Sequence, residues 1–501
     1  MRKRRMAKTA SLKRPSLTAL SAACAAVVLA GCSMIPKYER PAAPVAADWP
    51  SLNAAAGGTS FKTPAASTAV PAADIEWQTF FSDPKLRLLI EASLRNNRDL
   101  RVAVLNIEQA RAQYQIRRAD QLPTLNAALT GSRTPATGGA GGITSVYSAG
   151  LAVTAYELDF FGRVASLKEQ ALSQYLATEE GRKSAQIALI AQVANTYLSL
   201  LADEELLAIT QQTLDTRVES LRLGKMRFDN GVTSELDYRQ FESLLESARV
   251  AYAQIVRQRA LDQNLLTLLL GQPLTGDLAV ALPSGKGLAD MPVMADVPVG
   301  LPSDLLARRP DVRQAEQTLL ASNANIGAAR ANFFPRITLT GTAGSASNRL
   351  SGLFKSGSYG WTFAPQLILP IFDFGRNSAT LDSANVGREI AVAQYEKSIQ
   401  TAFREVADAL AGRATLGEQL RAAQAQANAE TVRFRLAGLR YENGVASSLD
   451  ALDAQRSLFA VQQTVVQTRL AQLQSQVTLY KTLGGGWKDE AVTPPAQPAS
   501  R

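Results

Sequence analysis

Four stretches of the chain carry apolar residues at helical spacing. Ala, Leu, Gln, Glu and Arg dominate these stretches, and their apolar side chains recur every three or four residues, which is the period of one helix face. The predicted helices are 163–225, 235–270, 376–439 and 447–483. A helix of about 60 residues rises about 90 Å. That length exceeds what a globular core needs, so the pattern favours a coiled coil or a helical barrel.

A second pattern, with a period of two, precedes each pair of long helices. Apolar residues alternate with mostly polar or small ones over 337–343 and 361–369, and more weakly over 125–131 and 146–156. Strands of about ten residues with one apolar and one polar face are typical of transmembrane β-strands. Four strands cannot close a barrel, and an open edge in lipid costs several kcal/mol per unpaired group. The pattern therefore predicts association of several copies, and either two or three would satisfy it.

The two halves of the chain repeat one another. RFDNGVTSELD at 227–237 returns as RYENGVASSLD at 440–450, 213 positions later. Other matches keep nearly the same spacing: Asp99 and Asp311, Pro123 and Pro335, Phe160–Arg163 and Asp373–Arg376, Gly271 and Gly484. Constant spacing over such a length predicts an internal duplication. We expect repeats at 75–272 and 303–484, joined by a linker at 273–302.

Each Asn-Gly-Val sequence lies where a long helix must reverse. Asn-Gly is expected to provide the left-handed residues that end a helix. Ser234 and Ser447 follow, and a serine in that place is expected to cap the next helix.

The N-terminus predicts an exported lipoprotein. A basic segment without acids precedes the apolar run 17–30, which is too short to span a bilayer and has the length of a signal-peptide core. The run ends in Leu-Ala-Gly-Cys, which resembles a bacterial lipobox, so we expect cleavage after residues 1–31 and acylation of Cys32. An ordinary signal peptide with a chance cysteine is the alternative. Residues 32–74 and 485–501, rich in Pro and Ala, are expected to form an extended tether and a tail.

Charge and composition then exclude several function classes. Seven positive charges lie within 1–31, so removal of that segment lowers the formal net charge from +9 to +2 and leaves no support for nucleic-acid binding. The chain has no histidine and only two cysteines, one of them in the signal segment. The commonest general base and metal ligand are thus missing. We expect no enzyme activity, no metal and no cofactor besides the lipid on Cys32.

The lipobox, the duplicated strand–strand–helix order, the FGR sequences and the paired NGV turns together resemble the outer membrane factor (TolC-like) family. The resemblance covers about 75–485 and is closest to the OprM-like (NodT) lipoprotein branch. It implies a mixed α and β membrane protein, namely a homotrimer with a twelve-stranded barrel in the outer membrane. A periplasmic α-helical barrel with an equatorial domain would continue the channel.

The resemblance also implies partners. A periplasmic adaptor (membrane fusion protein) would join the helical tips to an inner-membrane RND transporter, and pumped compounds would pass through the channel passively. The implied adaptor contacts are Arg227, Gly231, Arg440 and Gly444. The alternative for the two glycines is that they only close the turns.

Matching to the family also implies a periplasmic gate. Asp450 and Asp453 match its aspartate constriction ring, and Leu449 matches an apolar gate residue. Arg456 lies one turn beyond Asp453 and is expected to neutralise its charge. An aspartate that only complements the helix dipole is the alternative. Tyr441 and Asp237 match a tyrosine–aspartate pair that links two coiled coils in a closed channel.

A second link of the family is missing here, because the chain has Ala446 and Leu236 where the family pairs an arginine with a threonine. Two other export functions stay open, namely type I protein secretion and heavy-metal efflux. A structural coiled-coil lipoprotein is more distant, because a spacer has no use for strands with a polar face.

Overall fold

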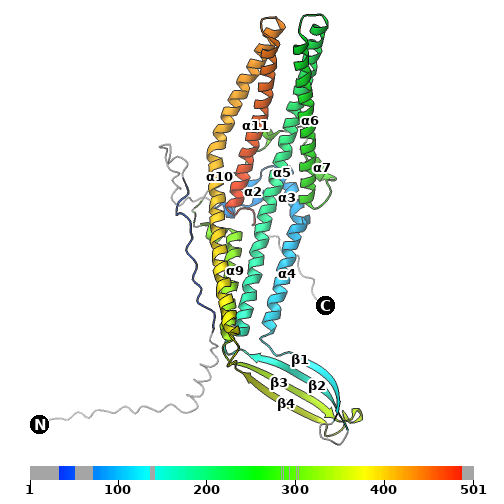
Figure 1. Ribbon diagram of the computed structural model, residues 1–501, viewed down its shortest axis with the longest axis vertical. Coiled ribbons are helices and arrows are strands. Elements are labelled where there is room, and N and C mark those ends of the chain that lie inside the picture. Colours follow the sequence, from blue (N-terminus) through cyan, green and yellow to red (C-terminus); the bar gives the residue numbers. More distant parts are fainter. Residues whose placement is uncertain are drawn as a thin grey trace, which may run out of the picture. The chain divides into compact units, whose positions relative to one another are not determined.

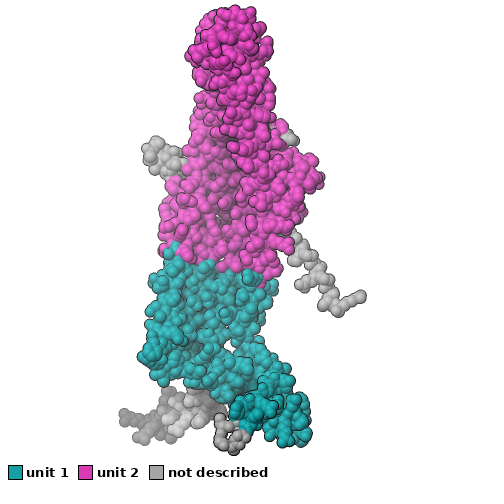
Figure 2. Space-filling view, turned by 45° about the vertical axis from the view of Figure 1, so that its right-hand side comes forward, with its two compact units in different colours: residues 1–40, 109–176, 317–393 teal, residues 41–108, 177–316, 394–501 magenta. Residues whose placement is uncertain are grey.

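The computed structural model describes residues 33–50, 71–135 and 142–487, apart from 284, 286, 293, 299, 301 and 303. The predicted signal segment, Cys32 and the end of the tail lie outside these residues. The chain forms two compact units (Figure 2). Their residues are 1–40, 109–176 and 317–393 in unit 1, and 41–108, 177–316 and 394–501 in unit 2. Each unit therefore combines segments from both halves of the sequence.

Unit 1 contains one antiparallel sheet in the order β1-β2-β3-β4 (Figure 1). Its strands are β1 (Leu125–Pro135), β2 (Ile143–Leu158), β3 (Arg336–Ser347) and β4 (Tyr359–Ile368). All four predicted strands are confirmed. Most of them extend beyond the predicted segments. The ends of the strands do not alternate between apolar and polar residues, but their backbones still pair with the neighbouring strands.

The two strand pairs repeat one contact. Thr130 and Ser148 face each other across β1 and β2, with their hydroxyl oxygens 2.6 Å apart. Thr342 and Thr362 do the same across β3 and β4 at 2.5 Å. Both pairs lie on the face opposite the apolar residues, as expected for strands that separate lipid from water.

Small residues bring the helices of unit 1 close together. Gly327 lies in α9 (Pro310–Ala331), where an added Cβ would lie 2.5 Å from Ser166 Oγ and 2.7 Å from a side-chain carbon of Ile35. Nearby, Asn323 donates a hydrogen bond to the Pro36 carbonyl at 2.8 Å. The start of the predicted tether is therefore seated on α9, a contact that its Pro- and Ala-rich composition did not indicate.

Unit 2 contains most of the helical residues. Two long antiparallel hairpins are formed by α5 (Arg163–Asp229) with α6 (Glu235–Leu270), and by α10 (Arg376–Glu442) with α11 (Ser448–Thr482) (Figure 1). The four predicted long helices are thus confirmed to within four residues at each end. The shorter helices are α2 (Trp77–Phe80), α3 (Pro84–Asn96), α4 (Arg98–Ala119), α7 (Asp277–Ala281) and α8 (Asp304–Arg308).

An aromatic cluster packs α2 against the end of α11. The rings of Phe80 and Tyr480 stack with centroids 4.1 Å apart, and Phe81 meets Tyr480 edge-on. The Tyr480 hydroxyl donates to the Ile75 carbonyl at 2.6 Å, so its polar end is satisfied inside the core.

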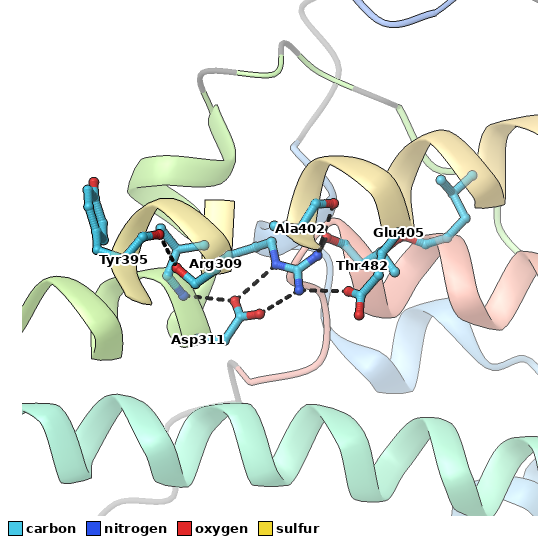
Figure 3. Close-up of polar contacts among 9 residues, drawn as sticks. Arg309, Asp311, Tyr395, Ala402, Glu405 and Thr482 are labelled. Carbon is cyan, nitrogen blue, oxygen red and sulfur yellow. Dashed lines mark hydrogen bonds and ion pairs between the residues drawn. The ribbon is translucent and has the colours of Figure 1, made fainter. Parts of the chain in front are cut away.

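Arg309 lies just before α9 and joins the start of that helix to α10 and α11 (Figure 3). Its guanidinium donates to the Thr482 carbonyl at 2.9 Å, to Asp311 at 2.5 Å and to Glu405 at 2.8 Å. The side chain is nearly buried, so these charge-assisted bonds compensate its desolvation.

The corresponding place in the first half uses a different residue for the same bond. Asn97 lies just before α4 and donates to the Leu269 carbonyl at 2.9 Å, in the last turn of α6. An unpaired carbonyl at a helix C-terminus is thereby satisfied in both halves. In the second half the donor is the charged Arg309, and the carboxylates of Asp311 and Glu405 balance its charge.

We predict that Arg309→Ala lowers the free energy of unfolding by about 3 kcal/mol, because it leaves Asp311 and Glu405 without their shared cation. Urea unfolding of the detergent-purified protein, followed by circular dichroism, measures the loss. The control is Arg308→Ala, which breaks a more exposed pair with Asp74 and should cost below about 1 kcal/mol. Equal losses in the two variants would contradict a special role for Arg309.

Candidate gate at the helical turns

The two turns have the same backbone structure. Gly231 and Gly444 adopt φ values of 68° and 74°, which favour glycine. The next residue closes the helix by a long-range bond: Val232 N–H donates to the Arg227 carbonyl at 2.9 Å, and Val445 N–H donates to the Arg440 carbonyl at 2.8 Å. This is the Schellman arrangement. The glycines are therefore needed for the turns themselves.

The asparagines play a different part from the one expected. Neither Asn230 nor Asn443 has a positive φ. Their side-chain amides instead donate to the carbonyls of Met226 and Leu439, both at 2.7 Å. The prediction that each Asn-Gly pair supplies left-handed residues was correct only for glycine, because asparagine ends the helix through its side chain.

Both serines cap the next helix as predicted. Ser234 and Asp237 form a reciprocal capping box at the start of α6, and Ser447 and Asp450 form another at the start of α11. The hydrogen bond from Ser447 is the largest cause that lowers the pKa of Asp450 below its ordinary value of 3.8. Asp450 thus caps the helix directly, a closer contact than the helix-dipole alternative, and the cap uses one of its two carboxylate oxygens.

The predicted link between Tyr441 and Asp237 is not formed. Asp237 accepts a short hydrogen bond from the hydroxyl of Ser448 on the other hairpin. The Tyr441 hydroxyl is buried and has no hydrogen-bond partner among the described residues. The prediction failed because the Ser448 hydroxyl occupies the place beside the Asp237 carboxylate that the Tyr441 hydroxyl was expected to take.

Tyr441 contributes through its ring instead. The guanidinium of Arg227 lies over that ring, 4.4 Å from its centroid, which is a cation–π geometry. The ring of Phe241 lies 6.3 Å away. Arg227 was assigned to adaptor contact, but in this structure it joins the first hairpin to the second. The two hairpins are thus linked at their tips by Asp237–Ser448 and by Arg227–Tyr441.

Asp453 is paired mainly with a residue that the sequence did not single out. Arg433 on α10 forms a short ion pair with it, whereas Arg456 lies 3.7 Å away. Arg456 was predicted to neutralise Asp453 and does contribute. Arg433 was missed because it lies across the hairpin, and no spacing along one helix predicts which residues face each other on antiparallel helices.

Arg217 is a buried residue on α5 that contacts both neighbouring helices. It donates to the Leu244 carbonyl at 2.7 Å and lies over the ring of Phe459 at 5.4 Å. Burial lowers its pKa, and nearby Arg456 lowers it further. It therefore connects α5 to both α6 and α11.

Leu449 and Asp450 are both exposed in the single chain, with Leu449 exposed to 55%. One chain places one leucine and two aspartates at the second turn, so a constriction needs further copies. Among the described residues, no three His, Cys, Asp or Glu side chains are grouped to hold a metal ion. The turns therefore bring together ion pairs, helix caps and exposed apolar side chains, with no group arranged for covalent chemistry among the described residues.

Two long helical hairpins and a four-stranded antiparallel sheet in one chain define the class of outer-membrane channel proteins, a class represented by solved structures. The chain of the open state of the Neisseria gonorrhoeae MtrE outer membrane channel superimposes with a TM-score of 0.80 at 40% identity, covering 91% of this chain and 99% of that one.

The family follows from sequence comparison. The profile described as "Outer membrane efflux protein" matches residues 89–272 and 301–485, and the chain belongs to this family. The Pseudomonas putida proteins named "Antibiotic efflux pump outer membrane protein ArpC" and "Toluene efflux pump outer membrane protein TtgC" are each 50% identical over 476 residues, covering 94% of this chain and 96% of each relative. The protein is an efflux channel of the outer membrane. The predicted family, function class and location are confirmed.

We predict that Ser448→Ala increases the ion conductance of the purified channel in planar lipid bilayers at pH 7. The variant removes the hydroxyl that links the two hairpins, so their tips separate more readily. Ser448→Thr keeps the hydroxyl and is the matched control, with conductance expected at the wild-type level. An unchanged conductance in Ser448→Ala would show that the link does not hold the tips together.

A second prediction concerns pH. Hydrogen bonds from Ser448 and Ser234 lower the pKa of Asp237 below its ordinary value of 3.8. A lowered pKa gives a stabilisation that is complete above that value and is lost as the pH falls through the lowered pKa. We therefore expect the Asp237–Ser448 link to contribute no change in conductance between pH 7 and pH 5. A rise at pH 5 in the wild type that Ser448→Ala lacks would contradict this.

Proposed function

We propose that the protein is the outer-membrane exit duct of a tripartite RND-type efflux pump and carries small apolar or amphipathic compounds, antibiotics and solvents among them. The single observation that carries this proposal is the 50% identity to efflux-pump proteins named for antibiotics and toluene, over nearly the whole length of both chains. A periplasmic adaptor and an inner-membrane transporter complete the machine. The duct itself catalyses no reaction.

The duct is a homotrimer. Each copy contributes four strands to a twelve-stranded barrel and two hairpins to a periplasmic helical barrel with an equatorial domain. The unpaired edges of β1 and β4 support closure by further copies, because lipid offers no hydrogen-bond partner to a strand edge. The matching hydroxyl pairs and helix-end contacts of the two halves support their origin as repeats, 75–272 and 303–484, with 273–302 as linker.

The tips of the hairpins form the gate. Threefold symmetry would place three copies each of Leu449, Asp450 and Asp453 around one axis, where a carboxylate ring attracts cations and resists close approach. The Asp237–Ser448 and Arg227–Tyr441 contacts oppose separation of the two hairpins. The exposed glycine turns and Arg440 would receive the adaptor, since an added Cβ at Gly231 or Gly444 would meet open space.

The N-terminal cysteine anchors the duct in the membrane. Cleavage after residue 31 would free Cys32 for acylation, and several acyl chains on one residue give firm attachment. The contacts of Ile35 and Pro36 with α9 support anchoring at Cys32, because they hold the chain in place three residues after the anchor.

Deletion of the gene tests the function. We expect accumulation of a fluorescent dye exported by the pump to rise severalfold in the deletion strain and to return to the parental level with a plasmid copy. Cells with the empty plasmid, and cells treated with a proton uncoupler, are the controls. Unchanged accumulation in a strain that expresses the gene and has no second duct would overturn the small-molecule proposal. Secreted proteins and metal salts would then be tested as cargo.

A further inference from the structure

Two acidic side chains face each other between the helices of the first hairpin. Asp203 of α5 is exposed to only 5%, and its carboxyl group lies within hydrogen-bonding reach of the Asp262 carboxyl group on α6. Oδ2 of Asp203 is buried and accepts no hydrogen bond from a donor among the described residues. Two carboxylates repel each other at close range, and a hydrogen bond between them requires a proton on one of the two. Asp203 and Asp262, the acid pair, are therefore arranged to share one proton.

The neighbouring cations are bound to other carboxylates. Arg259 lies one turn before Asp262 on α6 and pairs with Glu204, with 2.5 Å between Nε and Oε1. Arg469 of α11 lies 3.5 Å from Glu205. Each cation therefore has its own anion, and the acid pair has no cation of its own to balance a second negative charge.

The pKa of Asp203 reflects these surroundings. Burial is the largest cause that raises it, and the charge of Asp262 raises it further. Arg259 acts in the opposite direction and Glu204 in the same direction as Asp262, so the pKa moves from 3.8 to about 7. Because the two acids interact, the proton belongs to the pair.

Asp262 connects the acid pair to solvent. It is half-buried and lines a cavity of about 340 Å³ between α5, α6 and α11. Lys481 of α11 also lines this cavity, and the other polar residues around it are uncharged: Gln192, Asn195, Thr196, Ser199 and Thr478. A proton can thus enter and leave through Asp262 while Asp203 stays buried.

The second hairpin pairs its helices without acids at this level. With the constant spacing of 213 positions, Asp203, Glu204, Arg259 and Asp262 correspond to Leu416, Gly417, Gln472 and Ser475. The helices there approach closely, since a Cβ added at Gly412 would lie 2.5 Å from Ser475 Oγ. Helix pairing at this level therefore needs no buried acid, and the acid pair has a different role.

We propose that the acid pair is a proton-binding site that controls the first hairpin: one shared proton holds α5 and α6 together, and its loss loosens them. The matching positions of the second hairpin cannot respond in this way, because they carry Leu416 and Ser475. One hairpin of each chain thus senses pH while the other keeps its packing. This inference goes beyond the proposed duct, because it adds a site for a proton that involves neither cargo nor adaptor.

The direction of the effect follows from the raised pKa. A carboxyl group whose pKa is raised by packing stabilises that packing fully below its ordinary pKa of 3.8, and the stabilisation is lost as the pH rises through about 7. The first hairpin should therefore be closely packed at pH 5 and loosened at pH 8.

Loosening of the first hairpin bears on the tips. Asp237 and Arg227 both belong to this hairpin, and each is one side of a link to the second hairpin. A loosened first hairpin weakens both links. We expect the conductance of the channel in planar lipid bilayers to be higher at pH 8 than at pH 5.

Infrared spectroscopy of the full-length protein in detergent tests the shared proton. The difference between the wild type and Asp203→Asn should contain the band of a protonated carboxyl group at pH 6 and lose it by pH 9. Asp215→Asn removes an exposed aspartate of the same helix, so its difference spectrum should lack that band at both pH values. No band at pH 6 in the Asp203→Asn difference would overturn the proposal.

Hydrogen exchange tests the loosening, and the second hairpin is the internal control. After correction for the intrinsic effect of pH on exchange, amides at 200–206 and 259–265 should lose at least about tenfold of their protection between pH 5 and pH 8. Amides at 413–419 and 472–478 should keep theirs.

A double variant assigns the effect to the acid pair. Asp203→Leu with Asp262→Ser gives the first hairpin the residues of the second at these positions. Its protection and its conductance should be the same at pH 5 and pH 8. Asp203→Asn keeps the size of the side chain and should abolish the pH effect in the same way, even where the double variant folds poorly.

The possible failures are distinguishable. Equal loss of protection in both hairpins, or a pH effect that persists in both variants, would overturn the role of the acid pair. Unchanged conductance, with the infrared and exchange results as expected, would overturn only the transmission to the tips. None of these measurements involves dye export, so a failure of the proposed efflux function is recognised separately.

Discussion

A β-strand edge cannot remain unpaired in the apolar interior of a membrane, and this constraint governs the protein. Its sheet has four strands with two free edges, so a single chain is incomplete as a membrane structure. Within the chain, β2 of the first half joins β3 of the second half in one sheet. The outer edges of β1 and β4 then need partners from outside the chain.

The two helical hairpins are linked to each other at their tips, where the proposed gate lies. Their tips are joined by a hydroxyl–carboxylate bond and a cation–π contact, both between the two hairpins. Contacts of this size are individually modest. Asp453 is held across the second hairpin by Arg433, so its charge is balanced within each copy, whereas Asp450 is held by its helix cap and keeps its negative charge at the proposed constriction. The capping boxes and Schellman turns lie within each hairpin, so the proposed gate needs no unfolding of its helices to move.

Divergence between the halves has preserved contacts rather than residues. Asn97 and Arg309 differ in size and charge, yet each donates to the last turn of a long helix. Glu157 and Pro370 show the opposite outcome, because Glu157 forms an ion cluster with Arg163 and Arg336 and a proline cannot. The helix end must be satisfied in both halves, whereas an ion cluster is one of several ways to hold two strands together.

The amino-acid sequence alone was enough to predict the four strands, the four long helices and the two serine caps. These features follow from periodicity and from contacts between residues close in the chain. The partners of Asp237 and Asp453 could not be predicted in this way, because they depend on the packing that brings Ser448, rather than Tyr441, to Asp237 and places Arg433 opposite Asp453. The side chains that meet across two hairpins depend on the relative shift and rotation of helices. Differences of one residue in that shift change every partner, and no local pattern encodes them.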